Sequence, residues 1–158
     1  MNNKNYTTSL TVNESPEEVF NAINNVRGWW SQEIDGETDK LGAVFAYQFK
    51  DIHRCQLKIV EFIPNQKVVW QVLENHFNFT EDRTEWVGTK ITFEISQRSG
   101  KTEIRFTHVG LVPQYECYNA CSDGWRTYIN GSLRKLITTG AGQPNVGEAI
   151  TAGERALS

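Results

Sequence analysis

Residues 114–139 read QYECYNACSDGWRTYINGSLRKLITT, and this stretch decides the fold. Its apolar or small side chains recur every three or four residues and therefore share one face of a helix: Tyr118, Cys121, Trp125, Ile129, Ser132 and Leu136. Gly140 follows directly and suits the left-handed residue that ends a helix. The spacing predicts one helix of about 25 residues, roughly 40 Å long, which needs a broad apolar surface to cover.

The residues before this helix predict such a surface. Six stretches are rich in β-branched and aromatic residues and are predicted as strands: 6–13, 43–49, 54–63, 68–73, 89–97 and 102–109. The last two form a hairpin around 98–101, whereas 75–88 is predicted as a loop or a splayed hairpin. No helical pattern separates these strands after the second one begins, so the sheet is predicted to be antiparallel with helices on one face.

A helix start lies between the first two strands. Ser15-Pro16-Glu17-Glu18 has the S-x-x-E pattern of a capping box with proline at the first helical position. The helical pattern of apolar residues that follows is interrupted at Gly28. The predicted class is α+β: a curved antiparallel sheet of about six strands wrapped around a long C-terminal helix, with two short helices after the first strand. Residues 1–140 form this single domain, and 141–158 are predicted as a loosely ordered tail.

Composition excludes several functional classes. The 158 residues carry a formal net charge of −3, which gives no footprint for nucleic acid or a membrane surface. No apolar run approaches the roughly 20 residues of a membrane span, and the first residues lack a signal-peptide pattern, so the cytoplasm is expected. Three cysteines, Cys55, Cys117 and Cys121, lack metal-ligand spacing. Neither a metal nor a cofactor is predicted.

Six short motifs, which span nearly the whole domain, carry a family resemblance: Ser15-Pro16-Glu17-Glu18-Val19-Phe20, Trp29-Trp30-Ser31, Val68-Val69-Trp70, Glu85-Trp86-x-Gly88-Thr89, Phe106-Thr107-His108-x-Gly110-Leu111 and Cys121-x-x-Gly124-Trp125. With this order and spacing the chain resembles the helix-grip (START-like, SRPBCC) superfamily, and within it the bacterial relatives of the activator of the heat-shock protein 90 ATPase. The resemblance implies a cavity between sheet and long helix, in which superfamily members bind lipids, sterols or polyketides or act as cyclases. Because the eukaryotic namesake engages its client with an additional domain, its co-chaperone activity is not expected of these 158 residues.

Strand and helix alternation selects the side chains that would line this cavity. The predicted lining residues are Trp29, Trp30, Phe45, Tyr47, Leu57, Trp70, Phe93, Phe106, His108, Tyr118, Cys121 and Trp125. An ordinary place in the core is the simpler explanation for each of them. Trp70 and Trp125 are expected to face each other, either in direct contact or across a cavity. His108 and Tyr118 are the polar candidates, and Glu61 is expected at the rim.

Three functions follow as hypotheses. The first is non-enzymatic binding of a small apolar or aromatic molecule in the cavity, because ligand pockets are mostly apolar with a few placed polar groups. The second is a cyclase- or hydrolase-type enzyme that uses His108 or Glu61, although no catalytic motif is present and no catalytic residue is assigned. The third is a protein-interaction module, co-chaperone-like or a homodimer, with an exposed aromatic patch of Phe77, Phe79 and Trp86.

Overall fold

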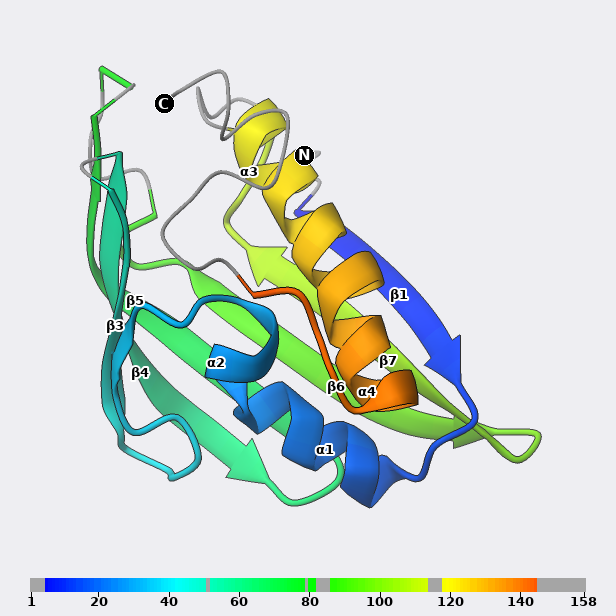
Figure 1. Cartoon of the computed structure of the whole chain (residues 1–158). Helices are drawn as coiled ribbons and strands as arrows, with labels where there is room; N and C mark the ends of the chain where they lie inside the picture. Colours follow the sequence, from blue (N-terminus) through cyan, green and yellow to red (C-terminus); the bar gives the residue numbers. More distant parts are fainter. Residues whose placement is uncertain (1–4, 51, 79, 82–85, 114–117, 145–158) are drawn as a thin grey trace.

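The computed structural model describes residues 5–50, 52–78, 80–81, 86–113 and 118–144, in which seven strands form one antiparallel sheet (Figure 1). The strands are β1 Tyr6–Val12, β2 Ile34–Gly36, β3 Val44–Phe49, β4 His53–Ile63, β5 Lys67–Phe77, β6 Lys90–Arg98 and β7 Lys101–Val109. Their order across the sheet is β1-β7-β6-β5-β4-β3-β2. The predicted antiparallel sheet is confirmed, with one strand more than expected.

The additional strand and one strand end differ from the predictions. β2 has three residues, of which only Ile34 is buried, so it lacks the alternation by which strands are recognised. β5 continues to Phe77, four residues beyond the predicted end, and pairs with the start of β4 (His53 with Phe77). Of the two alternatives for residues 75–88, a loop or a splayed hairpin, the start of the segment therefore agrees with the hairpin.

The helices cover one face of the sheet (Figure 1). The first is α1 (Pro16–Asn24), whose capping box forms as predicted: the Glu18 N–H donates to Ser15 Oγ and the Ser15 N–H donates to Glu18 Oε1, both at 3.2 Å. A single turn, α2 (Val26–Trp29), follows. The long helix comprises α3 (Tyr118–Arg126), a π-helical segment η1 (Thr127–Leu133) and α4 (Arg134–Thr139), and it ends at Gly140 with φ of 87°.

The π-helical segment was not predicted, because its wider turn leaves no mark in a 3.6-residue pattern. Four of its side chains are buried: Tyr128, Ile129, Ser132 and Leu133. The segment lies beside α2, so it meets the corner at which the two predicted tryptophans leave the helix. The change from α-helical to π-helical geometry in the long helix therefore lies beside the most aromatic part of the interior.

Residues 141–144, which we call the strap, turn back after Gly140 and run between α2 and the long helix (Figure 1). The Gln143 N–H donates to Ser132 Oγ at 2.7 Å. A Cβ on Gly142 would lie 2.4 Å from the Gly28 carbonyl oxygen, so only glycine fits this approach. The beginning of the predicted tail is thus bonded to the domain, and the remainder lies outside the described residues.

Candidate functional site

The corner after α2 places two adjacent tryptophans inside the domain. Trp29 Nε1 donates to the Ile23 carbonyl oxygen at 3.0 Å, and the Trp29 carbonyl oxygen accepts from Ser132 Oγ at 2.7 Å. The side chain and backbone of Trp29 are therefore fixed by separate hydrogen bonds. Because Ser132 also accepts from the strap, the π-helical segment, the corner and the strap are tied together at one hydroxyl.

Trp30 bridges the sheet and the long helix. Its indole stacks on Tyr47 with ring centroids 4.3 Å apart and an interplanar angle of 13°. It also stacks on Trp70 at 5.8 Å and contacts Trp125 at 5.1 Å. The sequence predicts that Trp70 and Trp125 either touch or face each other across a cavity. In the structure, the indole of Trp30 lies between them and contacts both.

His108 is the centre of a hydrogen-bonded chain. Trp125 Nε1 donates to His108 Nδ1 at 3.1 Å, so the other ring nitrogen carries the proton. His108 Nε2 then donates to Thr89 Oγ1 at 2.8 Å, and Thr89 Oγ1 donates to the Trp86 carbonyl oxygen at 2.6 Å. Burial, followed by the nearby His53, lowers the pKa of His108 to about 3. His108 is therefore neutral at pH 7 and both its nitrogens are engaged.

Trp86 lies at the junction between this chain and a second histidine. Its ring contacts His53 at 4.6 Å and His108 at 4.7 Å, both edge to face, and stacks on Trp125 at 5.8 Å. His53 Nε2 donates to Asn75 Oδ1 at 2.8 Å. Burial lowers the pKa of His53 to about 4, with a partial offset from that hydrogen bond. Both histidines around Trp86 are therefore uncharged at pH 7.

Two indole N–H groups in this interior have no acceptor among the residues that the structure describes. They are Nε1 of Trp70, which is fully buried, and Nε1 of Trp86, which is 3% exposed. A buried tryptophan normally pairs its N–H, and an unpaired buried donor costs about 1–3 kcal/mol. The aromatic interior therefore contains two donors that would gain from an acceptor.

The remaining predicted lining residues also reach this interior. Phe45 contacts Trp70 at 5.0 Å, Phe93 contacts Phe106 at 5.3 Å, and Phe106 contacts Trp125 at 4.8 Å. Leu57 is fully buried on β4. Tyr118 and Cys121 are only partly buried and pack at the border of the core. Contact of these residues with a ligand stays a prediction.

Two placements correct the sequence interpretation. Glu61 is exposed and pairs with Lys67 (Oε1 to Nζ, 3.5 Å), because the register of β4 against β5 shifts between Ile59 and Glu61 and turns Phe62 toward the core instead. The exposed aromatic patch is also wrong, since Phe77 and Trp86 are buried, at 1% and 3% exposure. Phe79 lies outside the described residues.

Sequence reasoning missed four residues of the site, His53, Asn75, Trp86 and Thr89. His53 could have been found by extending the alternation of β4 back by two residues from Cys55. Trp86 and Thr89 stand in the Glu85-Trp86-x-Gly88-Thr89 motif, but their aromatic and hydroxyl groups had no recognisable strand pattern around them. No pattern signalled Asn75, because a buried asparagine next to charged residues looks like a loop.

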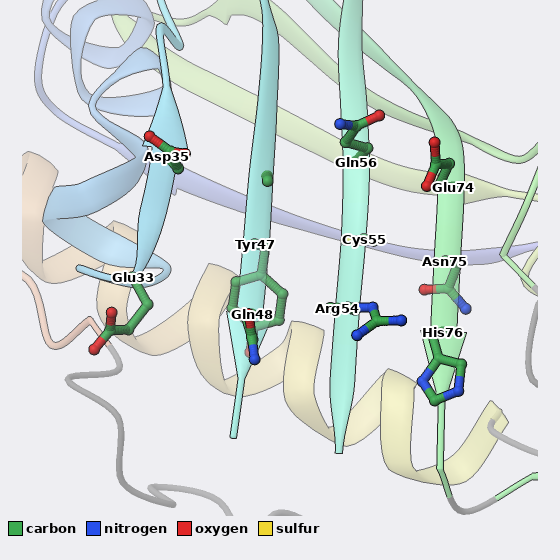
Figure 2. A pocket seen from close by; sticks show the side chains of 11 residues that line it. Glu33, Asp35, Tyr47, Gln48, Arg54, Cys55, Gln56, Glu74, Asn75 and His76 are labelled. Carbon is green, nitrogen blue, oxygen red and sulfur yellow. The ribbon is translucent and has the colours of Figure 1, made fainter. Parts of the chain in front are cut away.

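The opposite face of the sheet carries a hollow of about 440 Å³ over β3, β4 and β5 (Figure 2). Its rim is polar and consists of Glu33, Asp35, Gln48, Arg54, Gln56, Glu74 and His76. Cross-strand pairing brings Gln48, Arg54 and His76 into one row, while the small side chain of Ala46 leaves the space. Charged groups of both signs and open access to water make this hollow unsuitable for an apolar molecule.

The described part of the chain contains neither a cluster of metal-binding side chains nor a membrane-spanning helix. No group of three or more His, Cys, Asp or Glu side chains is arranged to hold a metal ion there. Among the helices of those same residues, none combines the length and apolarity that crossing a membrane requires. Burial also raises the pKa of the Cys55 thiol, so this cysteine stays protonated as a core residue.

Comparison with known proteins adds a family and a fold. Residues 13–138 match the family described as Activator of Hsp90 ATPase homolog 1-like protein. The Aha1 dimer of Colwellia psychrerythraea, a solution structure, is 25% identical with a TM-score of 0.70 and covers 88% of this chain and 99% of its own. SSP2350 of Staphylococcus saprophyticus is 18% identical with a TM-score of 0.65, and the match covers 89% of this chain and 96% of that one. CalU16 of Micromonospora echinospora is 13% identical with a TM-score of 0.59, and the match covers 85% of this chain and 76% of that one. These two proteins share the fold. No curated protein matches the sequence.

Proposed function

The chain belongs to the family of Activator of Hsp90 ATPase homolog 1-like proteins, and from this premise we propose that it binds a small apolar or aromatic molecule between the sheet and the long helix. One observation carries the proposal: the interior is built of aromatic rings and holds two buried indole donors, on Trp70 and Trp86, without acceptors among the described residues. A ligand with an apolar body and an acceptor atom would complete such a site. This is the composition of small-molecule sites in general.

Binding without chemistry is favoured over the cyclase or hydrolase alternative. A general acid or base needs a titratable group within reach of substrate and a pKa near the working pH. His108 uses both ring nitrogens within the protein and has a pKa of about 3. Glu61, the other candidate, lies on the surface beside Lys67. The two groups on which the enzyme hypothesis relied are thus unsuited to it.

The test begins with native mass spectrometry of the purified protein and mass analysis of any molecule released on denaturation. We expect a co-purified apolar or aromatic compound, or a compound from an aromatic and lipid panel that raises the melting temperature. A ligand at about 100 times its Kd adds about 2.7 kcal/mol to the free energy of unfolding. An empty protein whose melting temperature no panel compound changes would refute the proposal.

We also propose that the chain forms a homodimer in the cytoplasm. The support is the Colwellia relative, whose solution structure is a dimer and which aligns over 99% of its length. Light scattering coupled to size exclusion should then give twice the 18.1 kDa of one chain. A mass of one chain at micromolar concentration would contradict this.

A further inference from the structure

The sheet has two outer edges, and the first of them, β2, is protected. It has only three residues, and Arg27 occupies its outward carbonyl groups: Nε donates to the Ile34 oxygen at 3.1 Å and Nη2 donates to the Gly36 oxygen at 2.7 Å. Short strands and charged side chains are two means by which proteins keep a sheet edge from pairing with another chain. The β2 edge is therefore closed to a further strand.

The opposite edge, β1, lacks the protections that β2 has (Figure 1). Its seven residues, YTTSLTV, include no charged residue and no proline. They pair with β7 without a register shift, from Tyr6 with His108 to Val12 with Thr102. A long, regular and uncharged edge strand is a template for a further strand. β1 is therefore the edge at which this sheet can be extended.

The backbone groups of β1 point alternately toward β7 and away from it. The Tyr6 N–H donates at 2.8 Å to the carbonyl oxygen of Leu111, which lies just beyond the end of β7, so Tyr6 belongs to the inward set. The hairpin between β6 and β7 agrees, because its closing pair, Arg98 and Lys101, assigns the odd-numbered residues of β7 to β6 and the even-numbered ones to β1. The outward residues of β1 are Thr7, Ser9 and Thr11.

The outward backbone groups of β1 are available for hydrogen bonding. None of the residues that the structure describes is bonded to the N–H or C=O of Thr7, Ser9 or Thr11. The side chains of these three residues are exposed, whereas Tyr6 and Leu10 turn into the core. Because each residue offers one donor and one acceptor, the edge presents a regular row of both.

The outward residues of β1 form a palindrome about Ser9. A two-fold axis through Ser9 places it opposite Ser9 of a second copy and places Thr7 opposite Thr11 of that copy, with the strands antiparallel. Every outward N–H then meets an outward carbonyl oxygen, because residues directly opposite each other exchange both hydrogen bonds. The side chains that meet are small, uncharged and hydroxyl-bearing, which is a favourable cross-strand combination. The β1 edge is thus complementary to itself.

We propose that β1 is the interface of the homodimer: the β1 strands of two copies pair antiparallel about an axis at Ser9 and join the two sheets into one. The inference rests on the homodimer proposed above and adds the surface and the register by which the copies meet. A second copy suits this edge better than an unrelated strand does, because its outward groups match under two-fold symmetry. The dimeric state of the Colwellia relative supports the same occupant.

The first experiment places a charge at the axis. Ser9→Lys and Ser9→Glu should each weaken the dimer about tenfold in sedimentation equilibrium, because like charges then face each other across the axis. An equimolar mixture of the two variants should restore the dimer, because opposite charges then meet. Ser96→Lys is the matched control: it makes the same change at an exposed serine on β6, two strands away from β1, and should leave the Kd unchanged.

Amide hydrogen exchange tests the interface in the wild type. The outward N–H groups of Thr7, Ser9 and Thr11 should exchange about tenfold more slowly above the dimer Kd than below it, because pairing buries them. The N–H groups of Thr8 and Leu10 bond to β7 within each copy and should not depend on concentration in this way. If the Ser9 variants fail to fold, this measurement decides by itself.

Cross-linking tests the register. Opposite residues of a hydrogen-bonded antiparallel pair have Cα atoms about 5.5 Å apart, within the reach of a disulfide. Thr7→Cys mixed with Thr11→Cys should therefore give an oxidised heterodimer above the background of the wild type. Neither variant alone should do so, because its own position in the second copy lies four residues, or about 13 Å, away along the strand. A strong cross-link of Thr7→Cys with itself would overturn the axis at Ser9.

The outcomes separate the interface from the homodimer. A wild-type dimer whose Kd is unaffected by Ser9→Lys, and whose outward amides exchange equally at all concentrations, would overturn the β1 interface and leave the homodimer standing. A wild type that is monomeric up to millimolar concentration would refute both. Loss of the dimer in Ser9→Lys, with its return in the mixture and its retention in Ser96→Lys, would establish the interface.

Discussion

The two ends of the aromatic interior are built on different principles. At one end, which we call the anchored end, Trp125, His108, Thr89 and the Trp86 carbonyl form a chain in which each donor has an acceptor, although the indole N–H of Trp86 beside it has none among the described residues. At the other, the stacked end, Trp30, Tyr47 and Trp70 are held by ring contacts, and no described residue accepts from the Trp70 N–H. Directional bonds in a buried site select one geometry, whereas stacking tolerates replacement of one ring by another.

This difference predicts which end of the interior resists opening more strongly. Opening the anchored end would strand several buried polar groups at about 1–3 kcal/mol each. Opening the stacked end would cost ring contacts and burial but would break no hydrogen bond of the Trp30 indole with a described residue. Four measurements can break or sharpen the contrast between the two ends, and they follow from the largest expected effect to the smallest.

The largest effect is expected from His108→Leu at the anchored end. It leaves the Trp125 N–H without an acceptor and should lower the free energy of unfolding by about 3 kcal/mol in urea titrations. Adding Trp125→Phe should recover part of the loss, because the stranded donor is then absent. Strictly additive losses in the double variant would show that the hydrogen bond does not couple the two residues.

The second-largest effect is expected from acid, which should lower the free energy of unfolding through the histidines of the anchored end. The unfolded chain binds protons on its histidines below pH 6.5, whereas folded His108 and His53 stay neutral to about pH 3 and 4. Because the unfolded state binds more protons, stability falls as the pH drops from 6.5. The expected loss is about 2–3 kcal/mol for His108 between pH 6.5 and 4.5, measured as urea midpoints across pH. His108→Leu should lose this share of the slope, and an unchanged slope would contradict the assignment.

A matched pair of conservative variants compares the two ends directly. Trp125→Phe strands His108 Nδ1 and should cost about 1–3 kcal/mol. Trp30→Phe breaks no hydrogen bond with a described residue and should cost less than about 1.5 kcal/mol, mostly from lost contact area. Thermal and urea unfolding give both values. A larger cost for Trp30→Phe would reverse the contrast.

The smallest effect concerns the strap beside the stacked end. Gly142→Ala has no room next to the Gly28 carbonyl, so the strap should detach at a cost of about 1 kcal/mol without changing the pH slope. Gly124→Ala is the control, because its added methyl group meets nothing within 4 Å in the middle of a helix and should be neutral or stabilising by up to about 1 kcal/mol. Loss of stability in the control alone would refute the geometry of the strap.

Much of the fold could be predicted because it depends on short-range patterns. The capping box at Ser15, the hairpin around Gly100 and the helix end at Gly140 are local signals, and each lies where expected. The strand β2 was not predicted because three residues are too few to show an alternating pattern. The π-helical segment was not predicted because the apolar spacing of an α-helix does not reveal a wider turn. The site was harder. Alternation identified which side chains point inward, but not that Trp30 would separate Trp70 from Trp125.

The direction of a side chain is predicted wrongly where the pairing of two strands, and not the alternation along one strand, decides which way it points. Glu61 is in phase with Leu57 and Ile59 along the chain, yet the register shift in β4 places it outside. Trp86 belongs to an aromatic segment without a strand pattern, which suggested an exposed patch, although two histidines and Trp125 enclose its ring. Contacts between residues far apart in sequence decide such cases, and a single sequence does not contain them.

The pairing of β1 with β7 has a consequence for how the domain is made. Tyr6 pairs with His108 and Val12 with Thr102, so the first strand of this sheet to be synthesised forms its ladder only with the last strand of the sheet. At about 5–20 residues per second, roughly 5–20 s separate the synthesis of the two. During that time β1 waits as an unpaired edge. Its outward residues, Thr7, Ser9 and Thr11, are polar, so the waiting strand presents apolar side chains on one face only.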